Sequence, residues 1–401
     1  MNTEIRILAI LTLFVAGEVV AQNVKVNDGS LTIGGFVNST LYVQDQAFSF
    51  GNGQNAELPV PPQFASGNWF FDADLRNTRL WLNFSGPQLS ESWKVKAYLE
   101  GDFFGGYNGN SFVSAEQFIP RLRLAYADLI DSSLTIRIGQ AWAPLFGYVP
   151  VSLAHIAFPL GWASAGFPGW RFPGLFIYYT LTETGAPTTA QIQFAAMKPS
   201  WFTAPAAGNN DLNSGMTAGN ASLVPQLEAR LNLDGKISPT SAWGGYIVAH
   251  FDRKDLAGVN HPDSIPSKYL NGYAAEIGAR YSTEGFSFAG NAYYGKAIGQ
   301  QLGMLAQAGD IGGVGGWTQI GYNFDPHWGA YAFYGIDSPN KDDVVSAGAT
   351  RWQNQTADGL IRYKTGPYAL GVEWLHAALK TGPTGATTTG NQISFSLLYN
   401  L

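Results

Sequence analysis

The sequence predicts an all-β fold, a transmembrane antiparallel β-barrel of about sixteen strands. Strand-like segments alternate apolar and polar residues with a period of two, so each has one apolar and one polar face. Charged residues make up 13% of the 401-residue chain, against roughly 25% in soluble proteins, while aromatic residues reach 14%. Short turns also alternate with long connections. These features are typical of a barrel whose apolar face meets lipid and whose polar face lines a lumen.

The first residues, 1–21, have the pattern of an export signal. A basic residue precedes the apolar run Ile7–Val15, and small residues stand before a cleavage site at Gln22. The run has nine residues, whereas a helix needs roughly 20 to span a bilayer. We therefore expect a signal peptide, no transmembrane helix, and a single barrel domain at 22–401.

Turn residues such as Gly-Pro and Asp-Pro mark seven short connections, at 85–92, 130–133, 182–189, 235–240, 282–285, 325–327 and 364–367. Eight long connections are rich in Gly, Asn, Pro, Ser and Ala, near 45–70, 103–120, 142–170, 198–224, 252–268, 296–313, 336–354 and 380–390. Together they separate sixteen strands. Short turns at one rim and long loops at the other are the periplasmic and extracellular arrangement of bacterial outer-membrane barrels.

The alternation is clearest in three consecutive strands, 93–103, 121–129 and 134–142. It recurs in 225–234, 241–251 and 368–375. The strands at 31–44 and 171–181 are apolar or mixed on both sides, so their facing stays open. The Gly-rich pair near 315–335 could slip by one residue.

The last strand, 391–401, carries alternating apolar residues up to Leu401. Because an open sheet edge cannot face lipid, this strand should pair with the first strand near 31–44. Aromatic residues flank the short turns, for example Phe324 and Trp328. They favour a belt at the membrane–water interface, although aromatic residues beside turns also occur in β-sandwiches.

Two segments resemble known outer-membrane barrels. NQISFSLLYNL resembles the C-terminal assembly signal of Gram-negative outer-membrane barrels, and RLRLAYADLIDSSLTIRIGQAWAPLFG is similar to the central hairpin of general porins and the DcaP-like group. The mature chain looks like a Gram-negative sixteen-stranded porin. The resemblance implies a homotrimer with one diffusion channel per subunit. It also implies that the loop after the fifth strand, about 142–170, folds into the lumen and narrows it.

The inward faces of neighbouring strands gather more basic than acidic residues. Pairing across the connections places Asp102 opposite Arg121, and Glu100 opposite both Arg123 and Arg79. We expect the lumen wall to carry six basic side chains beside two acidic ones: Arg79, Lys94, Lys96, Arg121, Arg123 and Arg137 beside Glu100 and Asp102. In a narrow lumen such a strip lowers the entry cost of an anion. The alternative is that these residues are ion pairs that hold the sheet together.

The loop expected in the lumen carries no Asp, Glu, Lys or Arg between Ala143 and Trp170. In general porins, acidic residues of this loop face the basic ladder. Here the loop offers His155 and aromatic rings, and we expect Tyr148, His155 and Trp162 to line the constriction. A basic wall facing aromatic rings suits small anions with an apolar body, such as aromatic carboxylates. The alternative is that the rings pack the loop against the barrel.

These features predict a porin of the Gram-negative cell outer membrane that passes ions and small hydrophilic solutes by passive diffusion with mild anion preference. One alternative is a substrate-selective channel for small aromatic carboxylates. Another is a non-conducting structural or adhesive barrel whose long loops bind surfaces. The expected partners are solutes, outer-membrane lipid and further copies of the chain.

An enzyme, a cofactor or a metal site is not expected. The five histidines are scattered without metal-ligand spacing, and the chain has no cysteine. Some barrels are hydrolases, but we find no catalytic partner for His250, which projects inward. The net charge of −6 argues against nucleic acid.

Overall fold

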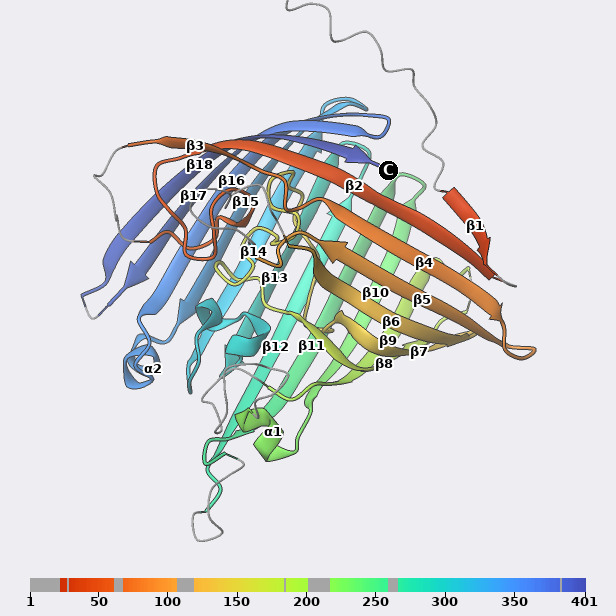
Figure 1. Cartoon of the computed structure of the whole chain (residues 1–401), viewed down its shortest axis with the longest axis horizontal. Coiled ribbons are helices and arrows are strands. Elements are labelled where there is room, and N and C mark those ends of the chain that lie inside the picture. Colours follow the sequence, from red (N-terminus) through yellow and green to blue (C-terminus); the bar gives the residue numbers. More distant parts are fainter. Residues whose placement is uncertain are drawn as a thin grey trace, which may run out of the picture.

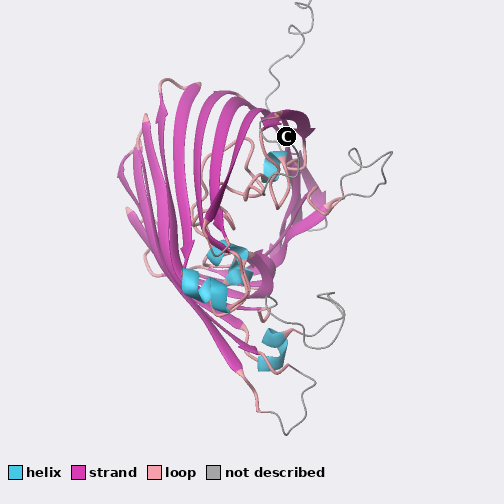
Figure 2. Ribbon diagram, turned by 90° about the vertical axis from the view of Figure 1, so that its left-hand side faces the viewer, coloured by secondary structure: helices cyan, strands magenta, loops and turns pink. Residues whose placement is uncertain are grey.

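The structure is a computed structural model. It describes residues 22–26, 29–60, 68–106, 119–183, 185–200, 217–258, 266–382 and 384–401. The expected signal peptide lies outside the described residues. The strands form a closed antiparallel barrel of sixteen strands, seen as a ring of tilted arrows in Figure 1 and around an interior crossed by loops in Figure 2. The predicted fold class is confirmed.

The barrel begins with β2 (Gly29–Gln44), and its second strand is interrupted between β3 (Phe70–Asp74) and β4 (Arg79–Gln88). Unbroken strands follow: β5 (Trp93–Asp102), β6 (Arg121–Asp131), β7 (Leu134–Trp142), β8 (Arg171–Thr180), β9 (Thr188–Met197), β10 (Gln226–Ser238), β11 (Ser241–Asp255), β12 (Tyr269–Ser282), β13 (Phe286–Lys296), β14 (Gly312–Asn323), β15 (Trp328–Pro339), β16 (Arg351–Thr365), β17 (Tyr368–Thr381) and β18 (Ala386–Asn400).

The helical segments in the described connections are short: η1 (Gly53–Asn55), α1 (Ala218–Ser222), η2 (Gly299–Gln301), η3 (Met304–Ala306) and α2 (Lys341–Ser346). None of them is long and apolar enough to cross a membrane.

The last strand closes the barrel against the first, as predicted. β18 pairs with β2 from Gln392 opposite Gln44 to Asn400 opposite Phe36. A further strand, β1 (Gln22–Val26), pairs with the opening residues of β2. β18 thus pairs with β17 on one side and β2 on the other, so the last strand does not present an open edge of unpaired backbone groups to lipid.

The two faces of the wall follow the sequence alternation. The outward residues Ile247 and Ile277 are cross-strand partners on β11 and β12, and they are 57% and 61% exposed. Their inward neighbours Val248 and Glu276 are buried. Apolar side chains outside and polar side chains inside are the reverse of a soluble protein and are expected of a wall between lipid and lumen.

Two local pairings differ from the expectation. In the β4–β5 pair Trp81, not Arg79, lies opposite Glu100; the shift is even, so the inward face is kept. In β6 a β-bulge leaves Arg123 as an extra residue, because Glu100 faces Leu124 and the next residue, Gly101, faces Leu122. The bulge exchanges the faces of the strand beyond this point.

We expect Ile277→Arg to lower the free energy of unfolding of the protein in lipid vesicles by about 2–4 kcal/mol, because a charge would replace an apolar group facing hydrocarbon. Urea titration of the reconstituted protein measures this. Thr240→Arg, in the exposed turn between β10 and β11, is the control and should change little. Equal effects of the two substitutions would contradict a lipid-facing position for Ile277.

Candidate functional site

The connection between β7 and β8, residues 143–170, folds into the barrel as predicted, and is called the pore loop below. In Figure 1 and Figure 2 irregular segments cross the space enclosed by the strands. The pore loop leaves the end of β7, contacts β10 near Leu145, and reaches β17 and β18 near Ala154 and His155 before it returns to β8. It therefore spans much of the interior.

Carboxylates of the barrel wall bind the backbone of the pore loop. Glu228 of β10 accepts a hydrogen bond from the Leu145 N–H at 2.7 Å. Glu373 of β17 accepts bonds from the N–H groups of Leu153 and Ala154, both at 3.0 Å, and from the Ser152 hydroxyl at 2.6 Å. Buried backbone donors need such partners, and an irregular segment cannot supply them itself.

Two wall amides bind both donors and acceptors of the same loop. Gln319 of β14 accepts from the Val151 N–H at 2.7 Å and donates to the Val151 carbonyl at 2.8 Å. Asn77 accepts from the Ala157 N–H at 2.9 Å and donates to the Ala154 carbonyl at 2.7 Å. These paired bonds determine the position of the middle of the loop.

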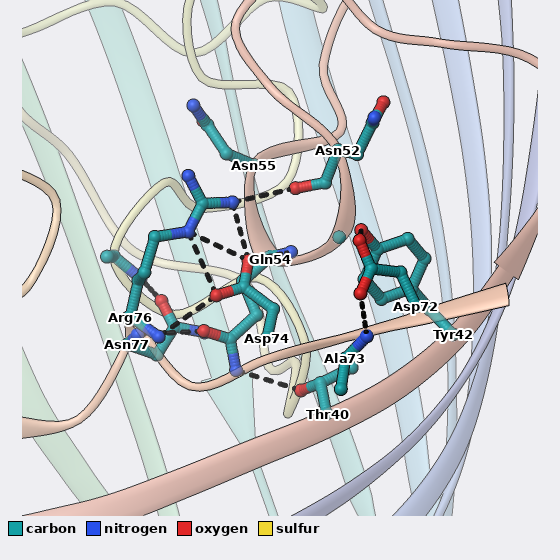
Figure 3. Close-up of polar contacts among 12 residues, drawn as sticks. Thr40, Tyr42, Asn52, Gln54, Asn55, Asp72, Ala73, Asp74, Arg76 and Asn77 are labelled. Atoms are coloured by element: carbon teal, nitrogen blue, oxygen red, sulfur yellow. Dashed lines mark hydrogen bonds and ion pairs between the residues drawn. The ribbon is translucent and has the colours of Figure 1, made fainter. Parts of the chain in front are cut away.

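Asn77 is itself held by a second inward connection, residues 45–60 (Figure 3). Gln54 of η1 accepts from the Asn77 N–H at 2.7 Å and donates to Thr40 at 2.9 Å. Asp74 accepts from the Gln54 N–H at 3.0 Å and forms an ion pair with Arg76 at 2.6 Å. The interruption between β3 and β4 thus places Arg76 and Asn77 inside the barrel, where they connect this loop to the pore loop.

The aromatic rings of the pore loop mainly pack against one another. Trp142 and Phe146 stack with centroids 3.8 Å apart, and Trp162 contacts both rings. The Trp162 side chain is 0% exposed, and its indole N–H donates to the Gly169 carbonyl at 2.6 Å. The expectation that Trp162 lines the constriction is therefore wrong, because a loop inside a lumen needs its own core.

His155 is also buried rather than on a solute-facing surface, which corrects its expected role. Its Nε2 lies 3.2 Å from the Gln392 carbonyl oxygen, and burial lowers the pKa of His155. Tyr148 is only partly buried, and its ring lies 4.7 Å from the Arg280 guanidinium. Of the three predicted pore-loop residues, Tyr148 alone keeps appreciable exposure.

Backbone proximity limits one position of the loop to glycine. Gly166 has φ +83°, and a Cβ atom there would lie 2.2 Å from the Gly316 nitrogen of β14. The loop therefore contacts the backbone of the wall directly.

The structure brings together the basic and acidic residues predicted for β4, β5 and β6. Asp102 forms ion pairs with Arg121 at 2.7 Å and Arg123 at 2.8 Å. Glu100 lies 2.7 Å from Arg123 and 3.8 Å from Arg79. Such cross-strand ion pairs are what the alternative interpretation, that these residues hold the sheet together, expects. Three arginines share two carboxylates here, so one positive charge is left over.

Two charged residues of this wall were missed from the sequence. Asp128 faces inward beyond the β-bulge and forms an ion pair with Arg137 at 2.7 Å. Recognition of the bulge would have revealed it. Arg171, the first residue of β8, is 5% exposed, and its guanidinium lies 4.9 Å from the Trp142 ring and 4.7 Å from the Trp170 ring.

Some arginine donors of the cluster are buried without a hydrogen-bond partner among the described residues. They are Nε and Nη2 of Arg79 and Nη1 of Arg171. Lys94 and Lys96 lie on the exposed part of β5 toward the short turn, away from this group. Buried, unpaired guanidinium N–H groups are strong donors for an anion. We call Arg79, Arg121, Arg123 and Arg171, with Glu100 and Asp102, the arginine cluster.

No protein-family model and no curated protein sequence matches the chain. Several solved structures share its fold. The outer membrane channel DcaP of Acinetobacter baumannii is 16% identical, with 93% of this chain and 97% of that chain covered and a TM-score of 0.67. The anion-selective porin from Comamonas acidovorans is 14% identical over 93% and 100%, with a TM-score of 0.58. OmpT of Vibrio cholerae, in its trimer form, is 10% identical over 93% and 99%, with a TM-score of 0.52.

These comparisons define the class of fold: the chain has the sixteen-stranded barrel of outer-membrane porins, with the third long loop inside. The resemblance drawn from the sequence is confirmed at this level.

We expect Glu373→Ala to destabilise the protein by about 3 kcal/mol or more, because it leaves two buried N–H groups and a hydroxyl without their acceptor. Glu373→Gln, which keeps one carbonyl oxygen, should have a smaller effect. Urea unfolding in detergent measures both, with Glu91→Ala in an exposed turn as the control. A Glu373→Ala protein as stable as the control would show that the wall does not hold the loop.

Proposed function

We propose that this protein is an outer-membrane porin that passes small hydrophilic solutes by passive diffusion with mild anion preference. The observation that carries the proposal is the arginine cluster on the wall formed by β4, β5, β6 and β8. Four guanidinium groups surround two carboxylates there. The excess positive charge lowers the entry cost of anions in a narrow, low-dielectric passage.

The covering of two acids elsewhere in the wall, on β10 and on β17, supports the same preference. Glu228 and Glu373 lie beneath the pore loop and are 4% and 1% exposed. Because their oxygens bind loop N–H groups, these acids are covered, whereas Arg121 and Arg137 keep about a fifth of their side-chain surface, 20% and 22%. The charge presented to a solute is therefore mainly basic.

The location and assembly are proposals of the same kind. The export pattern of residues 1–21 and the apolar outer wall support insertion into the outer membrane. The trimer form of the Vibrio cholerae structure supports a homotrimer. Each subunit would contain its own channel, because the barrel is closed within one chain.

We expect Arg79→Gln to lower the chloride-to-potassium permeability ratio by about twofold, since it removes a positive charge from the cluster. Reversal potentials in asymmetric KCl across a planar bilayer measure this ratio. Arg253→Gln is the matched control, because Arg253 lies between the buried, inward Asp252 and Lys254 on β11 and therefore faces outward, where it contacts Asn271 and Tyr269. An unchanged ratio in Arg79→Gln would assign the cluster a structural role only.

A selective channel for small aromatic carboxylates is a second candidate, and one contact favours it. The Arg121 guanidinium lies beside two rings that contact each other, 5.4 Å from Phe104 and 5.0 Å from Phe158. A guanidinium flanked by aromatic faces can bind a carboxylate while a ring of the ligand stacks beside it.

Benzoate would distinguish the two channels. A selective site should make benzoate block the chloride current in a saturable way, and Arg121→Gln should weaken this block by about tenfold. Cyclohexanecarboxylate, of similar size but not aromatic, is the control ligand. A general pore should show no saturable block. A purified, folded protein that conducts no ions would instead favour the structural or adhesive barrel.

A further inference from the structure

A third connection, besides the pore loop and residues 45–60, enters the barrel. Residues Ala297–Ile311, between β13 and β14, contain η2 and η3 and are called the sixth loop here. Gln300 and Gln301 of η2 are both 0% exposed. Fully buried glutamines in a loop are uncommon, and their amide groups must have partners.

Gln301 binds the end of the pore loop. Its backbone carbonyl accepts from the Gly169 N–H at 2.5 Å, and its side-chain carbonyl accepts from the Trp170 N–H at 3.2 Å. Gly169 and Trp170 are the last two residues before β8. One residue therefore holds both backbone donors at the exit of the pore loop.

The same side chain is connected to the beginning of the pore loop. The Gln301 amide nitrogen donates to Glu228 Oε1 at 3.0 Å and to Gln226 Oε1 at 3.1 Å. Glu228 Oε2 accepts from the Leu145 N–H at 2.7 Å. Gln301 thus contacts the carboxylate that binds the entry of the loop while it also binds the exit.

A network of buried polar and ionisable side chains on β10 and β11 anchors the sixth loop. The His250 ring bridges Glu228 at 2.8 Å and Asp252 at 2.9 Å. Asp252 also accepts hydrogen bonds from Lys254 and Gln300, and Lys254 donates to the Ala297 carbonyl at 2.8 Å. This network explains the inward His250 without any catalytic role.

The backbone of the sixth loop gives an independent observation. Five of the eight described non-glycine residues with positive φ lie in it: Ala297, Leu302, Met304, Leu305 and Ala306. Residues with a Cβ avoid this region, and a segment that uses it repeatedly persists only where its contacts impose it. Such strain is concentrated at positions where geometry serves a function.

We infer that Gln301 is a positioning residue of the channel, which holds the two ends of the pore loop and so sets the cross-section open to solutes. This inference rests on the proposed function, because the cross-section matters only if solutes pass. It makes the sixth loop, together with the pore loop, a determinant of pore size.

The test compares Gln301→Ala and Gln301→Glu with Gln307→Ala. Gln307 is a buried glutamine of the same loop, but it binds Met304 and the start of β16 instead of the pore loop. Gln301→Glu keeps the acceptor for Trp170 and places a carboxylate against Glu228. Both Gln301 variants should raise single-channel conductance by about 1.5-fold and admit larger neutral sugars, whereas Gln307→Ala should conduct like the wild type.

Hydrogen–deuterium exchange provides a readout that does not depend on conduction. Exchange in a peptide covering 162–172 should rise in both Gln301 variants and stay at the wild-type level in Gln307→Ala. Unchanged exchange with unchanged conductance would overturn the inference, and so would equal changes in all three variants, which indicate general destabilisation. A wild type without conductance would sink the proposed function, and the exchange comparison would then decide the role of Gln301.

Discussion

The interior of this barrel depends on hydrogen bonds between inward side chains of the wall and the backbone of the pore loop. An irregular segment in a closed space carries donors and acceptors that it cannot pair internally. Glu228, Glu373, Gln319 and Asn77 pair them from four different parts of the wall. Without these partners, leaving the lumen would lower the free energy of the loop, because water outside could bind its backbone.

This arrangement explains why the pore loop carries no acidic residues. The acids that bind its N–H groups, Glu228 and Glu373, belong to the strands and are buried beneath the loop. Because Glu228 and Glu373 are covered in this way, they do not face the arginine cluster as exposed acids. The charge asymmetry that we propose for the passage thus follows from the way in which the loop is held.

The aromatic rings connect the loop to the basic wall. Trp142 lies 5.7 Å from the Arg123 guanidinium and 4.9 Å from that of Arg171. Such cation–π contacts add to the packing of the rings around Trp162. They stiffen the part of the loop nearest the arginine cluster, and so would hold the guanidinium donors in place for the anion of the proposed function. Pre-organised donors of this kind lose little entropy when they bind.

The inward third loop was predicted from the resemblance to porins. The sequence alone determined the barrel, its sixteen strands, their inward faces in most of the wall and the closing pair. These features follow from period-two alternation and turn residues, which are local properties of the chain. The basic wall on β4 to β7 was found in the same way, through residues such as Arg121 and Asp102. The bulge in β6, which turns Asp128 inward, and the burial of Trp162 were decided by the tertiary structure. The tertiary structure also decided that Leu153 binds Glu373, 220 positions away in the sequence. The physical reason is that the position of a loop inside a barrel depends on which distant side chains satisfy its backbone, and no local pattern records that choice.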